Sequence, residues 1–578
     1  MTPFKTTYGA LTPLKMLPGV AGFAAVLMAA PLHAQTPPDA GQLLREQPKA
    51  PSVVPATPAP IAPAAPAAEP DAGPRVLVKG FRIQGALLIS EAELVAQLQD
   101  VVGKELSFRQ LQGTASHLIA YYAQKGYLAR VVLPPQDVKD GIVVLQVVEG
   151  KRGSLRIDRQ GERLDSARVE RLIDGRLASG DTMDIARLGE ALNILNEQPG
   201  IEAKAALAPG KGEAEIDLVV TAADKPLTNY SLGINNQGSV GTGKEQANGS
   251  ISINNPTGSF DAASLMLNAS QGATFGRADY SRAVGDGGLR LGVNASRLDY
   301  RLVQSTFAAL RGQGSASTVG LTASYPLARR EDFNLSFTAA ADGKQLIDRT
   351  VAGETGNRNV TVASLGLDGY RVDGPDSLLS GGITRFGTSL VVGNSDQRNR
   401  AALTADRAGR QVQGGFSKLG YSLGRLQSLT ETWSIDAGLR GQFAGKNLDS
   451  TERFSLGGPG GVRGYPVGEA SGDEGWLFNA SLNYRMNDSV GLSTFVDAGG
   501  ITINRRTWAG WNAGTPGLSN SYELAGAGFG FDWRPSKSIL INATLAGPLG
   551  SNPGRDARGR DSDNDTGTRS WLSLTAQF

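Results

Sequence analysis

The alternation of apolar and polar residues from about Thr228 to Phe578 constrains the fold of this chain more than any other feature. Turns rich in Gly, Asn, Asp and Ser separate the alternating segments, and no good amphipathic helix is expected among them. Membrane strands of about ten residues alternate because one face meets lipid and the other an aqueous interior. A water-soluble β-sandwich also alternates, but its strands are usually shorter. A strand together with half of its connecting turns takes about 22 residues. Residues 226–578 therefore predict a membrane β-barrel of about 16 antiparallel strands.

One glycine-rich stretch, Gly457–Pro466, interrupts the alternation. It cannot hold a helix or a regular strand, so its backbone must make tight turns. Arg463 is its only cation and Tyr465 its only aromatic residue. On this stretch alone, a flexible surface loop with a solvated Arg explains the sequence as well as a buried functional loop does. The flanking membrane-type strands favour the buried loop; their apolar positions are Trp433, Ile435, Leu439 and Phe443 before it, and Trp476, Phe478, Leu482 and Tyr484 after it.

A candidate partner for Arg463 lies on a later strand, in the segment Phe495–Gly499. The period of two places Asp497 on the face opposite Val496, and therefore toward the barrel interior. An Arg guanidinium can bind a carboxylate through two parallel hydrogen bonds, which fix orientation as well as position, and Lys cannot do this equally well. We therefore predict an Arg463–Asp497 pair. The alternative is a solvated Asp of the kind that any porin interior contains.

Residues 1–34 are expected to be a secretory signal peptide, because Lys5 and Lys15 precede an apolar run that ends at Ala34. A membrane anchor is the alternative, but prolines and a glycine interrupt the run. Residues 35–47 contain a short helical candidate that includes Leu43 and Leu44. The Pro/Ala-rich tract 48–75 cannot pack a core, and fully extended it would reach roughly 80 Å, more than the height of a membrane barrel. A simpler alternative treats all of residues 35–74 as a tether.

Two short α+β modules are predicted between this tract and the barrel. Module 1 covers residues 76–150 and module 2 covers residues 151–225. In module 1, Ser90 with Glu93 and Ser107 with Gln110 are predicted capping boxes, and Gly126 ends the second helix. Module 2 repeats the order, with predicted strand Ser154–Ile157, helices Asp165–Leu177 and Asp184–Asn196, and strand Ala214–Val220. Each module has roughly 70 residues and must rely on its neighbours for rigidity.

The composition argues against several functions. The net charge is +2 and 19% of the residues are charged, so the chain lacks the basic excess of a nucleic-acid-binding protein. Cysteine is absent, which excludes disulfides, thiolate metal sites and a Cys nucleophile. After residue 34 there is no run of about 18 apolar residues, so no transmembrane helix is expected. His117 is then the only histidine and lies in a predicted helix, which argues against a Ser-His-Asp centre or a His metal cluster.

Two further motifs are incomplete. The stretch Gly238–Lys244 has the spacing of a phosphate-binding loop, but Glu245 stands where Ser or Thr would bind magnesium. The aspartates at 561, 563 and 565 resemble a calcium loop, but the glycine is one place late and Leu572 replaces the bidentate Glu. We interpret the Asp-rich segment as a solvated extracellular loop. No catalytic, cofactor or metal site is predicted.

Four motifs together resemble the TpsB transporters of two-partner secretion, the haemolysin secretion/activation (ShlB/FhaC/HecB) family. They are Val462-Arg463-Gly464-Tyr465, Phe495–Gly499, the run from Tyr121 to Gln136, and the terminal Phe578. The resemblance covers essentially the whole chain after residue 34. It implies a barrel of 16 strands plugged by a helix from residues 35–47, and two periplasmic POTRA domains at modules 1 and 2. It also implies that the sixth extracellular loop, residues 446–475 and here called loop 6, folds into the barrel between strands 11 and 12.

The resemblance also implies roles for individual residues. The loop 6 tip consists of Val462, Arg463, Gly464 and Tyr465, and it would meet Phe495, Asp497 and Gly499 on the barrel wall. The apolar residues of the plug are Leu43 and Leu44. The motif of the first POTRA domain includes Gly126 and Tyr127. The C-terminal signal for barrel assembly comprises Trp571, Leu574 and Phe578.

The function implied by the resemblance is export of an unfolded partner exoprotein. The POTRA domains would recognise this protein in the periplasm of a Gram-negative bacterium, and the barrel would pass it to the cell surface without nucleotide hydrolysis or any cofactor. Other expected partners are outer-membrane lipid and, during biogenesis, the barrel assembly machinery; no nucleic acid and no enzymatic activity are expected. The alternative is a BamA-like assembly factor, which shares the loop motif. Two modules and a helix with a Pro-rich tether favour export.

Overall fold

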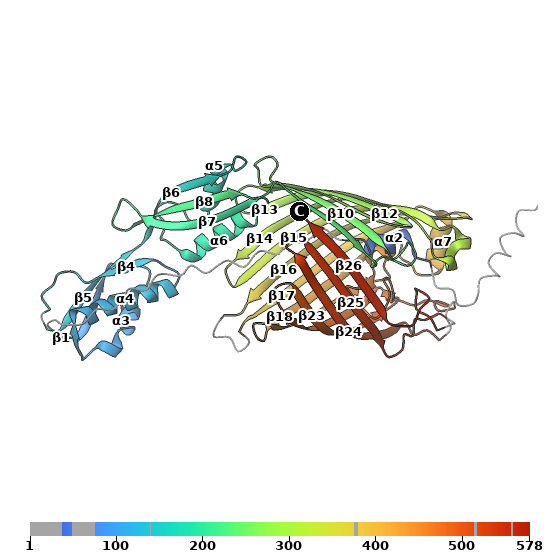
Figure 1. Ribbon diagram of the computed structural model, residues 1–578. Coiled ribbons are helices and arrows are strands. Elements are labelled where there is room, and N and C mark those ends of the chain that lie inside the picture. The colour runs from blue at the N-terminus through green and yellow to red at the C-terminus, as the bar shows by residue number, and fades with distance from the viewer. Residues whose placement is uncertain (1–36, 49–74, 139, 375–379, 514–516, 557–558) are drawn as a thin grey trace, which may run out of the picture.

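The computed structural model describes residues 37–48, 75–138, 140–374, 380–513, 517–556 and 559–578. Within these ranges sixteen antiparallel strands close into a barrel, which confirms the predicted fold class (Figure 1). Consecutive strands pair with one another, and β26 pairs with β9 to close the barrel. The predicted signal peptide lies outside the described residues, as does almost all of the predicted linker.

The strands of the barrel follow one another along the chain, with two short strands, β20 (Phe454–Ser455) and β21 (Ser471–Gly472), paired in loop 6. The barrel strands are β9 (Thr228–Asn235), β10 (Gln246–Asn254), β11 (Asp261–Ser270), β12 (Ala273–Val284), β13 (Leu289–Arg301), β14 (Gln313–Arg329), β15 (Phe333–Thr350), β16 (Gly353–Val372), β17 (Gly382–Gln397), β18 (Gly414–Ser428), β19 (Trp433–Ala444), β22 (Glu474–Arg485), β23 (Val490–Thr502), β24 (Ser521–Ser536), β25 (Ile539–Leu549) and β26 (Arg569–Gln577). Loop 6 ends two residues earlier than expected, because Glu474 and Gly475 belong to β22.

Apolar side chains cover the outer face of the barrel, as the alternation predicts. Large exposed apolar residues on successive strands include Leu265, Leu267, Val319, Leu321, Leu365, Leu390, Leu419, Phe443, Phe529 and Leu545. This outer surface is suited to lipid, since the strands satisfy their backbone hydrogen bonds in a closed sheet. None of the helices in the described part of the chain is long and apolar enough to cross a membrane.

Module 1 packs two helices on a three-stranded sheet of order β2-β5-β4. Ser107 and Gln110 form the predicted capping box of α4, and Gly126 adopts a φ of +86° just after that helix. Ser90 caps α3, but the Glu93 carboxylate accepts a hydrogen bond from the Tyr121 hydroxyl. The capping box predicted for Ser90 and Glu93 is therefore incomplete. The elements are β1 (Arg75–Leu77), β2 (Gly80–Gln84), α3 (Glu91–Ala96), η1 (Gln99–Val101), β3 (Glu105–Ser107), α4 (Phe108–Gln124), β4 (Ala129–Val132) and β5 (Ile142–Glu149).

Module 2 has the same layout around a sheet of order β6-β8-β7. Its elements are β6 (Lys151–Gln160), α5 (Ser166–Asp174), α6 (Ile185–Asn196), β7 (Ile201–Pro209) and β8 (Glu215–Asp224). The sequence predicted a second strand-helix-helix-strand-strand unit but did not locate β7, whose alternation is carried largely by alanines. The module packs against the barrel end (Figure 1): Phe260 and Ala283 join its core, and Arg329 of β14 bonds Glu197 at 2.5 Å.

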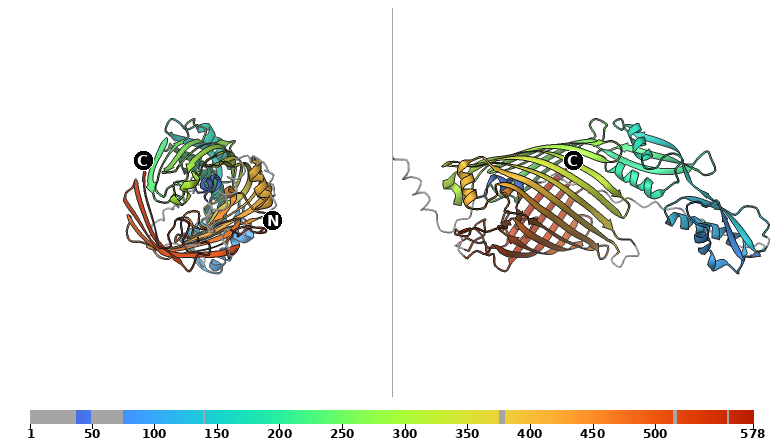
Figure 2. Two further views of the ribbon diagram at one scale, coloured as in Figure 1. Left: turned by 90° about the vertical axis from the view of Figure 1, so that its right-hand side faces the viewer. Right: turned by 180° about the vertical axis from the view of Figure 1, so that it is seen from behind.

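Helices also occur within the barrel region and its interior. The helix α2 (Ala40–Arg45) lies inside the ring of strands, as the end-on view in Figure 2 shows. The helix α7 (Arg400–Ala408) lies in the connection between β17 and β18, contrary to the expectation of no helix after Thr228. None of its nine residues is buried, and its apolar face spans fewer than three turns; Asn399 caps its first turn. The short helices η2 (Ser305–Leu310) and η3 (Ser450–Glu452) complete the elements.

Candidate functional site

Loop 6 connects β19 to β22, the eleventh and twelfth barrel strands, as predicted. Its tip lies against the inner wall of the barrel, where Val462 and Tyr465 are fully buried. Backbone hydrogen bonds from Val462 N to the Leu456 carbonyl (2.7 Å) and from Gly458 N to the Tyr465 carbonyl (3.0 Å) fold the stretch back on itself. Gly458 adopts a φ of +104°, a conformation that L side chains rarely reach. The loop 6 tip is therefore a built structure and not a flexible loop.

Arg463 and Asp497 form a bidentate ion pair in the structure. Arg463 Nε is 2.8 Å from one Asp497 carboxylate oxygen, and Nη2 is 2.7 Å from the other. The backbone N–H of Arg463 also donates to Asp497, at 3.0 Å. The Asp497 side chain is fully buried and that of Arg463 is 18% exposed, so little water screens the pair. The alternative of a solvated interior aspartate does not fit this geometry.

Neighbouring groups fix the same pair from several strands. The Arg463 guanidinium lies over the Phe495 ring, 3.3 Å from its centroid, in a cation–π contact. Asn479 of β22 donates to both Asp497 (2.7 Å) and the Gly461 carbonyl (2.9 Å). Trp571 of β26 donates from Nε1 to the Arg463 carbonyl at 2.9 Å. The loop 6 tip is thus fastened to β22, β23 and β26 at once.

Close approach explains two of the glycines. A Cβ on Gly464 would lie 2.7 Å from the Gly547 carbonyl oxygen of β25, so only glycine lets the tip touch the strand backbone here. A Cβ on Gly499 would lie 2.6 Å from the Leu456 side chain and 2.8 Å from the Trp476 carbonyl oxygen. Both residues therefore provide space for loop 6 at the wall.

The predicted C-terminal signal residues divide between the two faces of β26. Trp571 points inward, is 7% exposed and bonds the loop 6 tip, whereas Leu574 and Phe578 are 39% and 69% exposed on the outer face. The odd and even positions of a strand lie on opposite faces, so Trp571 cannot share a lipid-facing surface with the other two. The sequence grouped the three residues and missed the contact between Trp571 and Arg463.

The helix α2 sits in the barrel interior on an apolar patch. Ala40 and Leu43 are buried against residues from several strands, and Leu44 packs partly buried beside them; the patch includes Phe275, Leu298, Tyr300, Leu346, Val360 and Val391. Asp39 caps the helix by accepting from Gln42 N at 2.9 Å. At the other end Arg45 donates to Ser450 and Ser471 of loop 6, at 3.0 Å each. The helix therefore contacts both the wall and loop 6.

Arg358 of β16 joins the helix, the wall and loop 6 at one point. Its guanidinium lies 3.0 Å from Asp39, the cap residue of α2, 2.8 Å from Asp348 of β15 and 2.7 Å from Asp449 of loop 6. Asp348 also accepts from Ala40 N at 2.8 Å. No pattern in the sequence pointed to this cluster, because its four charged residues come from four separate segments.

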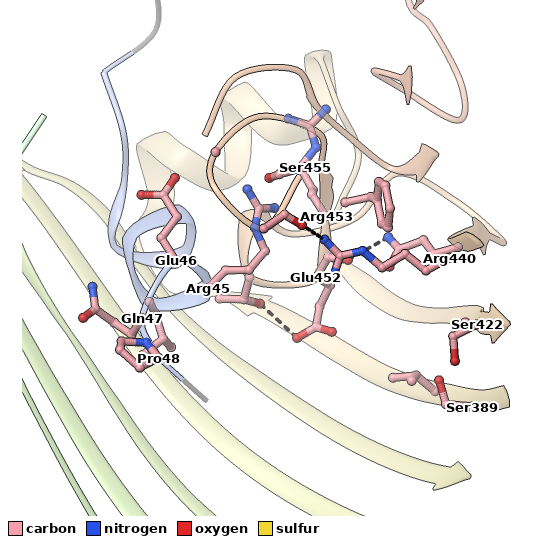
Figure 3. Close-up of a pocket in the computed structure, with 18 of the residues that line it drawn as sticks. Arg45, Glu46, Gln47, Pro48, Ser389, Ser422, Arg440, Glu452, Arg453 and Ser455 are labelled. Carbon is pink, nitrogen blue, oxygen red and sulfur yellow. Dashed lines mark hydrogen bonds between the residues drawn. The ribbon is translucent and has the colours of Figure 1, made fainter. Parts of the chain in front are cut away.

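A cavity of about 1270 Å³ remains beside α2 and loop 6 (Figure 3). The view shows Arg45 and Glu46 next to Glu452 and Arg453 of loop 6, with Ser389 and Ser422 on the strands below. Glu452 lies 2.6 Å from Lys344 and 2.9 Å from Lys418, which ties loop 6 to β15 and β18. Charged and polar groups from α2, loop 6 and the strands thus line much of the space that remains in the interior.

Two of the three aspartates in the segment near the C-terminus are not solvated, contrary to the sequence interpretation, whereas Asp565 is exposed. The side chains of Asp561 and Asp563 are buried and each lies 2.9 Å from Arg569 Nη2, while Lys244 reaches Asp563 at 3.3 Å. Ion pairs of this kind hold the segment, and no cluster of metal-ligating residues occurs among the residues described. Nearby Glu469 of loop 6 accepts from Asn552 at 2.7 Å, and burial raises its pKa.

Gly126 and Tyr127 lie where module 1 meets module 2. The Gly126 carbonyl accepts from Ile185 N at 2.9 Å, and Tyr127 forms a β-bridge with Asp184. Asp184 and Ile185 lie at the start of α6, and Gly126 and Tyr127 directly follow α4. The motif therefore links the end of α4 in module 1 to the start of α6 in module 2. The structure gives it a role in the joint between the modules.

A closed barrel of sixteen strands, an inward-folded loop and small α+β modules at one end define an outer-membrane transporter of the POTRA-plus-barrel class. Residues 212–532, more than half of the chain, match the family of haemolysin secretion/activation proteins ShlB/FhaC/HecB, and residues 76–150 match the ShlB-type POTRA domain. The chain belongs to this family. It is therefore a TpsB transporter of two-partner secretion, located in the outer membrane with its POTRA domain in the periplasm.

Individual relatives agree with this assignment. The chain is 29% identical over 495 residues to the heme/hemopexin transporter protein HuxB of Haemophilus influenzae, covering 84% of each chain. The structure of CdiB from Escherichia coli is similar with a TM-score of 0.66 at 20% identity, over 90% of this chain and 93% of that one. The structure of BamA from Haemophilus ducreyi lacking POTRA domains 1–3 is similar in fold, with a TM-score of 0.52 at 16% identity. The match covers 87% of this chain and 100% of that one.

Proposed function

We propose that this transporter takes an unfolded partner exoprotein from its periplasmic modules and passes it through the barrel interior to the cell surface. The observation that carries the proposal is the way the interior is filled. Ion pairs and hydrogen bonds hold the helix α2 and loop 6 in place inside the barrel. Polar contacts of this kind can be exchanged for water or for a passing chain, so the interior can be occupied at rest and open during transport.

Modules 1 and 2 are the proposed receptor for the exoprotein. A small sheet with a free edge can accept an extended chain as an additional strand, which gains main-chain hydrogen bonds with little demand on sequence. The joint at Gly126 and Tyr127 would hold the two modules in a fixed relation during this contact. Removal of residues 76–149 is expected to abolish export while the barrel still reaches the membrane.

The decisive experiment uses as the client a TpsA-type exoprotein, which is to be sought first in the adjacent coding region. Co-expression with the full-length transporter should place the client in the medium or on the surface, and the variant lacking residues 76–149 should leave it in the periplasm at equal barrel levels. Normal export by the truncated transporter would contradict the receptor role. Heat-modifiability on gels controls for a folded barrel.

The helix α2 is the proposed plug, with Leu43 and Leu44 as its apolar contacts. Residues 48–75 provide a tether long enough for the helix to leave the lumen, roughly 80 Å when extended. Deletion of residues 39–47 should raise single-channel conductance in planar bilayers and leave export largely intact. Unchanged conductance would mean that the helix does not limit the pore.

We further propose that Leu574 and Phe578 are read by the barrel assembly machinery, since both face outward at the end of the last strand. Transport is expected to need no nucleotide, cofactor or enzymatic step, because the family consists of transporters. The rival function is that of an assembly factor that inserts other barrels. Its support is the BamA-like fold alone, whereas the family match favours export. Defective insertion of other barrels in a deletion strain would favour the rival.

A further inference from the structure

A second cavity lies at the extracellular rim of the barrel, at the end opposite the modules. Its volume is about 890 Å³, and three connections line it: the one carrying α7, here called loop 5 (residues 398–413), the start of loop 6, and the part of loop 7 around residues 506–508, between β23 and β24. In Figure 1, α7 marks this end of the barrel, opposite the modules. The ion pairs and hydrogen bonds on which the proposed transport function rests involve none of these lining residues.

The cavity carries an excess of positive charge. Its charged lining residues are Arg407, Arg410, Lys446 and Arg506 against the single carboxylate of Asp406. Asp406 is already satisfied, because it accepts from the backbone N–H groups of Val412 (2.8 Å) and Gln413 (2.9 Å). Of the four cations, only Arg410 has an acidic partner within ion-pair distance in the described part of the chain, Asp473 at 3.6 Å. Arg407, Lys446 and Arg506 therefore form an uncompensated positive cluster.

Hydrogen bonds hold the three loops in place around this cluster. Asn447 is 5% exposed and donates to the Arg410 carbonyl (2.7 Å) and to the Arg506 carbonyl (2.8 Å), while it accepts from Arg506 N at 2.7 Å. Lys446 Nζ donates to the Gln413 carbonyl at 2.8 Å. Since these bonds fix the backbone of the three loops, an anion entering the cavity would meet ordered walls and would bind at low cost in ordering.

The position of the cavity relative to the lipid-facing surface indicates the kind of anion. Ser417 and Gly445 belong to its lining. They continue the outer face two residues beyond Leu419 and Phe443, which are paired across β18 and β19 and are 43% and 57% exposed. Because lipid headgroups lie directly beyond the apolar band, we infer that the positive cluster stands at the level of phosphate groups of outer-leaflet lipids. Trp508 adds an apolar ring surface to the lining, suited to a sugar face.

We propose that this cavity binds the phosphorylated sugar headgroup of an outer-leaflet glycolipid. Arg407 and Arg506 would contact phosphate oxygens through guanidinium forks, for which phosphate is a preferred partner, and Lys446 would add a point charge. Basic pockets between membrane-spanning elements bind anionic headgroups in the same way. Binding there would join loops 5, 6 and 7 at the outer end of the barrel.

The test measures lipid binding by native mass spectrometry of the full-length protein in detergent. The probes are diphosphoryl lipid A, monophosphoryl lipid A and inorganic phosphate. We expect diphosphoryl lipid A to remain bound, monophosphoryl lipid A to bind more weakly, and inorganic phosphate in large excess to displace neither. Displacement by inorganic phosphate alone, or equal binding of the two lipid forms, would overturn the proposal of a lipid headgroup.

Variants locate the binding in the cavity. The double substitution Arg407→Gln with Arg506→Gln should weaken diphosphoryl lipid A binding at least about tenfold, since charge-assisted hydrogen bonds are lost. The matched control is Arg400→Gln, which removes an exposed cation from the same helix outside the cavity lining and should leave binding unchanged. Wild-type binding by the double variant, or an equal loss in the control, would refute the site. Each single substitution is measured as well, so that a folding defect of the double variant cannot decide the result.

Discussion

Substitution of Arg463 by Ala tests whether the loop 6 tip must be held at the barrel wall. The change removes two guanidinium hydrogen bonds to Asp497, at 2.8 and 2.7 Å, and the cation over the Phe495 ring. The bonds of Asn479 and of Trp571 to this region do not involve the Arg463 side chain and remain possible. The barrel ladder is untouched, so we expect a folded barrel with a released tip and severely reduced export.

The free-energy cost of losing the Arg463–Asp497 pair follows from the burial of the Asp497 carboxylate. Breaking a buried ion pair by removing one partner costs about 3 to 5 kcal/mol, because the other charge stays buried. Asp497 keeps two donors, Arg463 N and Asn479 Nδ2, so we take the lower limit of about 3 kcal/mol. At one decade per 1.4 kcal/mol, the ratio of undocked to docked tip should rise about 100-fold. Asp497→Ala should behave similarly, and the double substitution should be little worse than either single one, because coupled residues are not additive.

A thiol reporter makes the undocking measurable. The chain contains no cysteine, and Val462 is fully buried at the tip, so Val462→Cys introduces one thiol that a maleimide reaches only after undocking. Labelling rates are compared with and without Arg463→Ala in this background. The matched control is Arg485→Ala, which removes an exposed arginine at the far end of β22. Export of the client is measured in parallel at equal amounts of heat-modifiable barrel.

Two results would refute this reasoning. The first is an unchanged labelling rate together with normal export by Arg463→Ala, which would mean that the pair does not hold the tip. The second is a pair of single substitutions whose export defects add in the double variant, since independent contributions would exclude coupling between Arg463 and Asp497.

Three other perturbations test separate parts of the structure. Gly464→Ala should reduce export strongly, because its Cβ would meet the β25 backbone, whereas Gly460→Ala, whose Cβ has open space, should export normally; equal export by both would contradict the close approach. Arg358→Ala should raise single-channel conductance in bilayers, because three carboxylates then face one another without their shared cation; unchanged conductance would show that this cluster does not retain α2. In module 1, hydrogen bonds from Tyr121 and Lys125 lower the pKa of Glu93. These bonds therefore stabilise the fold above the ordinary Glu pKa, and this stabilisation is lost as the pH falls through the lowered pKa. Calorimetry of the full chain should show this acid-side loss, and Glu93→Gln should lack it; an identical pH dependence in the variant would exclude Glu93 as its cause.

Features set by local periodicity could be predicted from the sequence. The outward positions of Leu419 and Phe443 and the inward position of Asp497 follow from a period of two, and the barrel is the closed form of such strands. The cap at Ser107 follows from four residues of sequence. The Arg463–Asp497 pair could be predicted because a strand fixes the direction of one partner and the glycine-rich loop offers a single cation.

Features set by side chains without periodicity were missed. The helix α7 has only nine residues and none of them is buried, so its apolar face is too short to stand out among the alternating segments around it. The aspartates at 561 and 563 looked solvated because Arg569 follows them on the next strand and Lys244 is more than 300 residues away in sequence. The inward direction of Trp571 follows from strand parity, but its partner on loop 6 does not.

The Arg358 cluster shows why the interior was harder to predict than the wall. A single guanidinium serves Asp39, Asp348 and Asp449, which reach it from the plug segment, a strand and loop 6. Each carboxylate alone reads as an ordinary polar residue on a loop or an inward-facing strand position. Only the closed barrel makes them neighbours, and once they are neighbours each depends on the same cation for its charge balance. A plug held in this way is released without breaking any strand pairing, because loss of the Asp39 contact leaves Arg358 paired with the other two. The same cation can therefore hold loop 6 while the helix departs.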